Sequence, residues 1–85
     1  MYQVLFQKSA IKGLRRMPRK IAGRIVSELE RIAASPMNYS EDWKKLKGSN
    51  YWRLRVGRYR AICDIRDDEL VLLVIHAGPR GDVYK

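Results

Sequence analysis

The chain has few of the residues on which most enzyme chemistry depends. Its 85 residues include one cysteine, Cys63, one histidine, His76, and nine scattered acidic residues. We find no metal-ligand spacing, no serine nucleophile with an oriented histidine and no carboxylate pair, so we expect neither a metal nor a cofactor. The segment 78–81, GPRG, is too short for a nucleotide-binding loop and lacks the helix that follows one. A lone cysteine forms no disulfide within the chain, which fits a reducing cytoplasm.

Long apolar runs are also absent. The opening MYQVLFQKSA has neither the basic lead nor the apolar run of a signal peptide, and no segment approaches the roughly 20 residues of a membrane-spanning helix. We therefore expect a soluble cytoplasmic protein with no membrane partner. With 46% apolar residues, the chain is predicted to fold as one domain, 1–85, near the lower size limit for a core without disulfides or metals.

Positive charge is what the chain has in excess. Eighteen Lys and Arg residues against nine Asp and Glu give a net charge of +9, and the sequence pI is about 10.1. Fifteen of the basic residues but only four of the acidic ones fall within 1–60. The excess favours an anionic partner. The alternative interpretation is a basic surface that only keeps the protein soluble.

The N-terminal half is predicted to hold a strand and two helices. Alternating apolar residues from Tyr2 to Phe6 indicate a strand, and Ser9 is expected to cap the helix that follows. A second helix is expected from Pro18 to Ala34. Its apolar stripe has helical spacing and consists of Ile21, Ile25, Leu29 and Ile32. After a break at 35–38, the polar segment up to Asn50 is predicted to be a loop anchored by Trp43 and Leu46, and its Lys44, Lys45 and Lys47 are candidate RNA contacts.

The C-terminal half is predicted to form three strands that gather arginines on one face. In the strand from Tyr51, side-chain alternation places Trp52, Leu54 and Val56 in the core, and Tyr51, Arg53 and Arg55 on the other face. A turn at Gly57 would fold 58–65 back alongside this strand and bring Arg60 near Arg53 and Arg55. An apolar strand, 70–77, would follow an acidic turn and lead to Arg80 and Tyr84.

This order predicts an α+β fold, β-α-α-β-β-β, in which two N-terminal helices pack on one face of a small, mostly antiparallel sheet. The other sheet face would stay partly open and be bordered by Arg53, Arg55 and Arg60. Tyr51 is a candidate for stacking on an RNA base, whereas Trp52 and Tyr59 are assigned to core packing.

Arginines and a tyrosine support one main kind of chemistry, which is to bind a phosphodiester and stabilise the charge that grows as it is cleaved. RNA suits this better than DNA because its 2′-OH can attack the adjacent phosphate. The protein then needs only to align that attack and manage two protons, without a metal.

The segments "WRLRVGRYRAICDI" and "DDELVLLVIHAGPRGDVY" resemble the RelE/ParE superfamily of bacterial toxins, and the resemblance spans nearly the whole chain. It implies the RelE-like fold and a toxin of a type II toxin–antitoxin system. RelE-branch toxins are endoribonucleases (mRNA interferases) that cleave mRNA in the ribosomal A site and are inhibited by an antitoxin. ParE-branch toxins instead poison DNA gyrase.

The resemblance places the superfamily's nuclease residues on Arg53, Arg55, Arg60, Arg80 and Tyr84. It implies that Arg80 stabilises the leaving group, Arg60 and Arg53 bind phosphate, and Arg55 aligns the 2′-OH. RelE has lysines in place of Arg53 and Arg55, and arginine is a poor general base. The base is therefore left open between Tyr84, His76 and a group of the ribosome.

The resulting expectation is a ribosome-dependent endoribonuclease that acts on translated mRNA and is neutralised by a cognate, RelB-like antitoxin. One alternative is a ParE-like gyrase inhibitor without nuclease activity. Another is a basic RNA- or ribosome-binding module that cleaves nothing.

Overall fold

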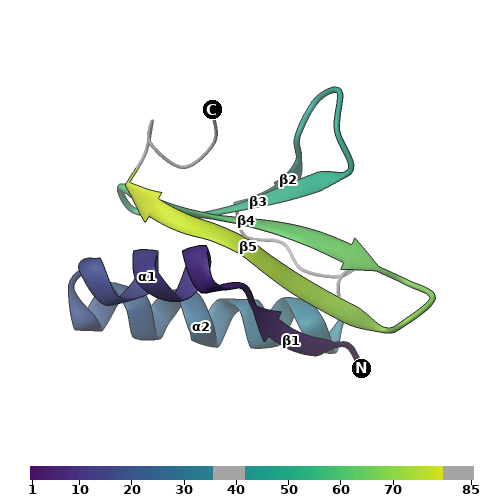
Figure 1. The fold of residues 1–85 in the computed structure, drawn as a ribbon, viewed down its shortest axis with the longest axis horizontal. Coiled ribbons are helices and arrows are strands. Elements are labelled where there is room, and N and C mark those ends of the chain that lie inside the picture. The colour runs from purple at the N-terminus through teal and green to yellow at the C-terminus, as the bar shows by residue number, and fades with distance from the viewer. Residues whose placement is uncertain (36–41, 80–85) are drawn as a thin grey trace.

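The computed structural model describes residues 1–35 and 42–79 and contains one five-stranded sheet in the order β1-β5-β4-β3-β2. The strands are β1 (Gln3–Phe6), β2 (Trp43–Lys45), β3 (Tyr51–Val56), β4 (Tyr59–Arg66) and β5 (Val71–Pro79). β1 runs parallel to β5, and the other neighbouring pairs are antiparallel. The helices α1 (Lys8–Arg16) and α2 (Arg19–Ala34) cover one face of this sheet (Figure 1). The predicted α+β fold is therefore confirmed.

The core lies between α2 and the sheet. Ile25, Leu29 and Ile32 of the predicted α2 stripe are buried, with Leu54 and Val74 among the sheet residues of the same core cluster. The stripe forms because four-, four- and three-residue spacings place these side chains on one side of a helix. No helix within 1–35 or 42–79 is both long and apolar enough to cross a membrane.

Cys63 is completely buried on the helix-facing side of β4 and belongs to the core cluster. Burial raises the pKa of its thiol well above the ordinary value, because the thiolate loses its hydration in an apolar interior. The thiolate is the nucleophilic form of cysteine, so Cys63 is unreactive in the folded protein.

Two local predictions were wrong. Trp43–Lys45 forms strand β2 instead of part of a loop, because Trp43 stacks on Trp52 of β3 with ring centroids 5.2 Å apart. Three residues are too few to show an alternating pattern. Ser9 does not cap α1, since the N-cap is Gln7 and the Ser9 hydroxyl donates instead to the backbone oxygen of Ile75 in β5.

A β-bulge divides β5 into two parts. Ile62 of β4 pairs with His76, but the next residue, Cys63, pairs with Val74, so Ile75 is an extra residue in β5. The part before Ile75 pairs with β1 on its outer side. The part after Ile75 is flanked by α1.

The contact between α1 and β5 requires a glycine. A Cβ built on Gly13 would collide with the carbonyl oxygen of Ala77 and lie 2.7 Å from its carbonyl carbon. Since both partners are backbone, neither can yield without moving the helix or the strand. The absence of a side chain at this position lets α1 lie directly against β5.

Gly13→Ala is expected to destabilise the protein by about 1–3 kcal/mol, because it forces apart two packed backbones. Gly23→Ala in α2 is the matched control, since a Cβ there meets nothing within 4 Å. That variant should gain roughly 0.5–1 kcal/mol from improved helix propensity. Urea unfolding of both variants measures the difference, and equal stabilities would contradict the close α1–β5 approach.

Candidate functional site

The sheet face that turns away from the helices carries three arginines on adjacent strands. Arg53 and Arg55 lie on β3, and Arg60 of β4 pairs directly with Arg55. Paired residues of antiparallel strands project to the same face, so these side chains share one surface. We refer to Arg53, Arg55 and Arg60 as the arginine face. The predicted gathering of these side chains is confirmed by the strand register.

Asp42 holds two members of the arginine face. Its Oδ1 accepts a hydrogen bond from Nη2 of Arg53 at 2.9 Å, and its Oδ2 accepts one from Nε of Arg55 at 2.7 Å. Its backbone oxygen also accepts from the backbone N–H of Arg55 at 3.0 Å. One carboxylate thus orients two guanidiniums that would otherwise repel each other.

The electrostatics of Asp42 reflect this arrangement. Partial burial raises the pKa of its carboxyl, but the hydrogen bond from Arg55 and the charge and hydrogen bond of Arg53 outweigh that effect. The net result is a pKa below the ordinary value. Asp42 is therefore ionised at neutral pH. Asp42 was not among the residues predicted from the sequence, because the segment around it was interpreted as a loop with no register to Arg53.

The two arginines of β3 differ in exposure. The Arg53 side chain is 10% exposed and that of Arg55 is 38% exposed. Arg53 was expected to point outward beside Arg55, but its guanidinium is buried against Asp42. Its Nη1 is also buried and has no hydrogen-bond acceptor among the described residues. Arg55 donates to Asp42 through Nε alone, so this pair does not use its two terminal nitrogens.

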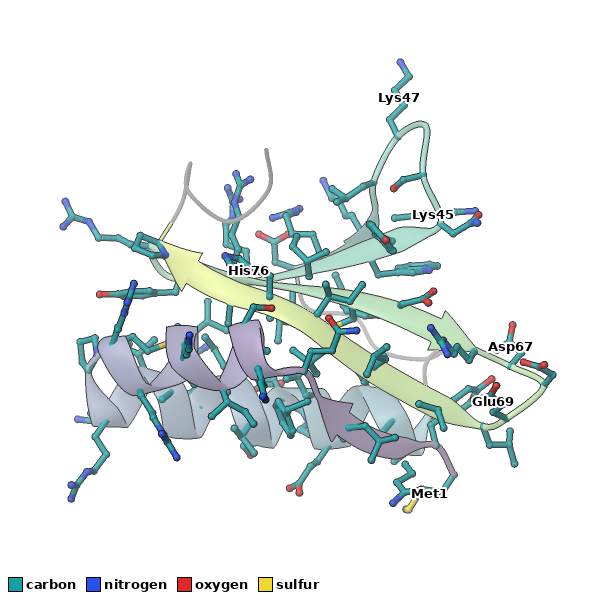
Figure 2. The ribbon with its side chains drawn as sticks, in the orientation of Figure 1. Met1, Lys45, Lys47, Asp67, Glu69 and His76 are labelled. Atoms are coloured by element: carbon teal, nitrogen blue, oxygen red, sulfur yellow. The ribbon has the colours of Figure 1, made fainter. Side chains whose placement is uncertain are left out.

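The three candidate lysines do not lie together. Lys44 of β2 pairs with Arg53 and shares the arginine face. Lys45 pairs with Trp52 and projects to the opposite face. Lys47 lies in the loop between β2 and β3 and extends away from the sheet (Figure 2). Only Lys44 is thus placed next to the arginines.

The aromatic residues largely follow the expected division. Trp52 stacks on Trp43, and Tyr59 packs against the core cluster, so both serve packing. Tyr51 is half-buried on the side of β3 that carries Arg53 and Arg55. Its stacking role stays a prediction.

His76 lies on the same side of the sheet as the arginines, because it pairs with Ile62 and Gly78 pairs with Arg60. Its position on β5 is labelled in Figure 2. The two remaining candidates, Arg80 and Tyr84, lie outside the described residues. Their roles stay predictions.

Asp42→Asn is expected to lower the free energy of unfolding by about 1 kcal/mol at pH 7, because Asn keeps the shape but not the charge that Arg53 and Arg55 require. The folded-state pKa is lowered, so this stabilisation is present above the unfolded pKa of about 3.9 and is lost as the pH falls through the folded value. The difference from wild type should thus shrink toward pH 3 in thermal or urea unfolding. Asp64→Asn is the control, since Asp64 pairs with the half-exposed Arg66. A difference that does not change with pH would contradict this account.

Residues 4–84 match the family model described as "ParE toxin of type II toxin-antitoxin system, parDE". Toxin RelE3 of Methanocaldococcus jannaschii is 36% identical to this chain, over 96% of this chain and 94% of the relative. A putative RelE-like toxin protein of Escherichia coli is 26% identical, over 98% and 90%.

Solved structures give the same result. The chain is similar to the toxin in the RelB–RelE antitoxin–toxin complex from Methanococcus jannaschii, with a TM-score of 0.74, 33% identity and 89% coverage of each chain. It is also similar to a chain of the archaeal RelE–RelB complex from Pyrococcus horikoshii, with a TM-score of 0.79, 26% identity and coverage of 95% and 97%. The family model, the 36% identical relative and these structures agree, and the chain belongs to the RelE/ParE superfamily of toxins from type II toxin–antitoxin systems.

Proposed function

We propose that this protein is a ribosome-dependent endoribonuclease, which cleaves mRNA in the ribosomal A site by attack of a 2′-OH on the adjacent phosphate, without a metal. The observation that carries the proposal is the arginine face, on which one carboxylate fixes two guanidiniums beside a third arginine. Fixed guanidiniums are suited to a phosphate, because their donors match its oxygens and need no reorganisation when charge develops.

The side chains suggest a division of roles around the reacting phosphate. Arg55 is more exposed and keeps its terminal nitrogens clear of Asp42, so it would contact the RNA directly and align the 2′-OH. Arg60, directly opposite, would bind the phosphate. The buried Arg53 would add positive charge beneath the phosphate. Because Asp42 bonds to both arginines, Arg53 would also help to keep Arg55 in position. Arg80 would stabilise the leaving group and the transition state.

Two protons must be moved during the reaction, and arginine is too weak an acid to exchange them at neutral pH. The candidates for the base remain Tyr84, His76 and a ribosomal group. Nearby guanidiniums would favour the phenolate form of Tyr84. His76 is supported by its location on the same side of the sheet as the arginines. A site with no strong base of its own would depend on the ribosome to hold the message in a reactive shape.

We further propose that a RelB-like antitoxin neutralises the protein in the cytoplasm. Relatives with 33% and 26% identity were solved as complexes of RelE with RelB. A net charge of +9 favours a partner that brings acidic side chains to the basic surface.

A second candidate function is inhibition of DNA gyrase. It is favoured by one observation, the match of residues 4–84 to a family model named for ParE toxins. A gyrase inhibitor acts through protein contacts, so it does not require an arginine face that is held in register. We therefore rank it second.

Arg60→Ala is expected to reduce cleavage about 10²- to 10³-fold, because it removes a donor to the charge that develops in the transition state. The assay maps cut ends by primer extension on mRNA, free and on programmed ribosomes. Arg58→Ala is the matched control, since Arg58 is an exposed arginine in the turn between β3 and β4, outside the arginine face. It should cleave like wild type. Arg80→Ala and Tyr84→Phe test the two predicted residues beyond β5.

The same assay separates the two candidate functions. A-site cuts by wild type that Arg60→Ala, Arg80→Ala and Tyr84→Phe abolish would establish the nuclease and its residues. Intact message in every lane, with wild type still toxic and DNA damage in the cells, would rule out the nuclease and favour gyrase inhibition.

A further inference from the structure

A pocket of about 280 Å³ lies where α1 meets the part of β5 that follows the bulge. The residues of α1 that line it recur at helical spacing, and Ala77, Gly78 and Pro79 of β5 line the opposite side. The lining residues used below are Ser9, Lys12, Gly13, Arg16, His76 and Gly78. Gly13 lets the helix lie directly against the strand, which brings its neighbours on α1 next to β5 at this pocket.

The pocket is electropositive. Lys12 and Arg16 lie four residues apart on α1, which places them on the same side of the helix. No acidic residue occurs in α1, and neither Lys12 nor Arg16 has an ion-pair partner within 1–35 and 42–79. Two like charges one turn apart destabilise a helix slightly. An anion between them would remove that repulsion.

The pocket adjoins the arginine face across one edge of the sheet. Gly78, in the pocket wall, pairs with Arg60, and Arg60 pairs with Arg55. The pocket wall is thus about 10 Å, or two interstrand spacings, from the backbone of Arg55. His76 lines the pocket and projects to the same side of the sheet as the arginines. A single backbone of linked phosphates could therefore extend from the arginine face into the pocket.

We propose that the pocket between α1 and β5 is a second phosphate-binding site, in which Lys12 and Arg16 hold an RNA backbone phosphate next to the one at the arginine face. The proposal rests on the proposed function in that it takes RNA as the ligand. The pocket's small volume suits a single compact anion. An acidic protein helix would need a long groove to dock into, and a pocket of about 280 Å³ is too small for one.

The RNA phosphate could belong to the message or to the ribosome, and both offer the same chemistry. If it belongs to the message, the pocket fixes the strand at a second point and helps to align the bond at the arginine face. If it belongs to ribosomal RNA, the pocket anchors the protein in the A site. In both cases Lys12 and Arg16 bind RNA and take no part in the proton transfers.

The test compares two double variants of α1, each of which loses one lysine and one arginine. Lys12→Gln with Arg16→Gln removes the cations of the pocket, and Lys8→Gln with Arg15→Gln removes exposed cations that do not line it. Binding is measured over a range of salt concentrations to a short single-stranded RNA carrying 2′-O-methyl groups, which cannot be cleaved by 2′-OH attack, and to vacant ribosomes. Thermal unfolding confirms that both variants fold.

The pocket variant should bind about tenfold more weakly, and its slope of log affinity against log salt should flatten by about 0.7, because one phosphate contact is lost. The control variant should stay close to wild type. If the pocket variant binds the short RNA more weakly, the site belongs to the message. If it binds only the vacant ribosomes more weakly, the site belongs to ribosomal RNA.

Two results would overturn the proposal. One is an equal loss of binding in the two variants, which indicates diffuse charge. The other is normal binding of the pocket variant both to the short RNA and to vacant ribosomes. Because binding is measured without cleavage, these results are independent of the nuclease assay. If the wild type cuts mRNA while the two variants bind RNA equally well, the pocket proposal is wrong and the proposed nuclease function is unaffected.

Discussion

The arrangement of the molecule depends on β5, which must contact three different elements at once. Before the bulge it pairs with parallel β1 on one side, along its length it pairs with β4 on the other, and after the bulge it receives α1. β1 and β5 lie near opposite ends of the chain, so their pairing closes the fold around nearly all of the described residues. α1 is therefore placed relative to the arginine face through β5, whereas α2 packs on the sheet directly. This explains why a glycine is required where α1 crosses β5.

The arginine face shows how a small sheet tolerates concentrated positive charge. Arg53, Arg55, Arg60 and Lys44 lie on one surface, and Asp42 is the carboxylate that bonds to two of them. One negative charge is enough to orient the β3 guanidiniums but not to neutralise the group. Within residues 1–35 and 42–79, the four cations outnumber the one carboxylate that bonds to them, and the donors of Arg53 and Arg55 are already in position. Preorganisation of this kind lowers the cost of binding an anion, since the side chains need not be ordered during the encounter.

The sequence predicted the elements that depend on periodicity. The α2 stripe of Ile25, Leu29 and Ile32, and the alternation that separates Leu54 from Arg53, appear in the structure as expected. Features set by contacts between distant segments were not predictable. The short strand β2 depends on the stacking of Trp43 on Trp52, and the role of Asp42 depends on its position beside Arg53, eleven residues away. The burial of Arg53 was missed for the same reason, because side-chain alternation predicts which face of the sheet a residue occupies but not which residues cover it.

The extra residue at Ile75 reverses the alternation of β5 partway along its length. Val74 faces the helices, yet His76, two residues later, faces the opposite side with the arginines. In an unbroken strand these two side chains would share a face, and the imidazole would be directed into the apolar core. The bulge therefore lets one strand have two independent patterns, one that builds the core next to β1 and one that presents polar groups beside β4. Deleting a single residue between Val71 and Ile75 would leave the rest of the strand's sequence unchanged but would exchange its inner and outer side chains on one side of the deletion. Sequence comparisons across this strand are therefore meaningful only if the bulge is kept in register.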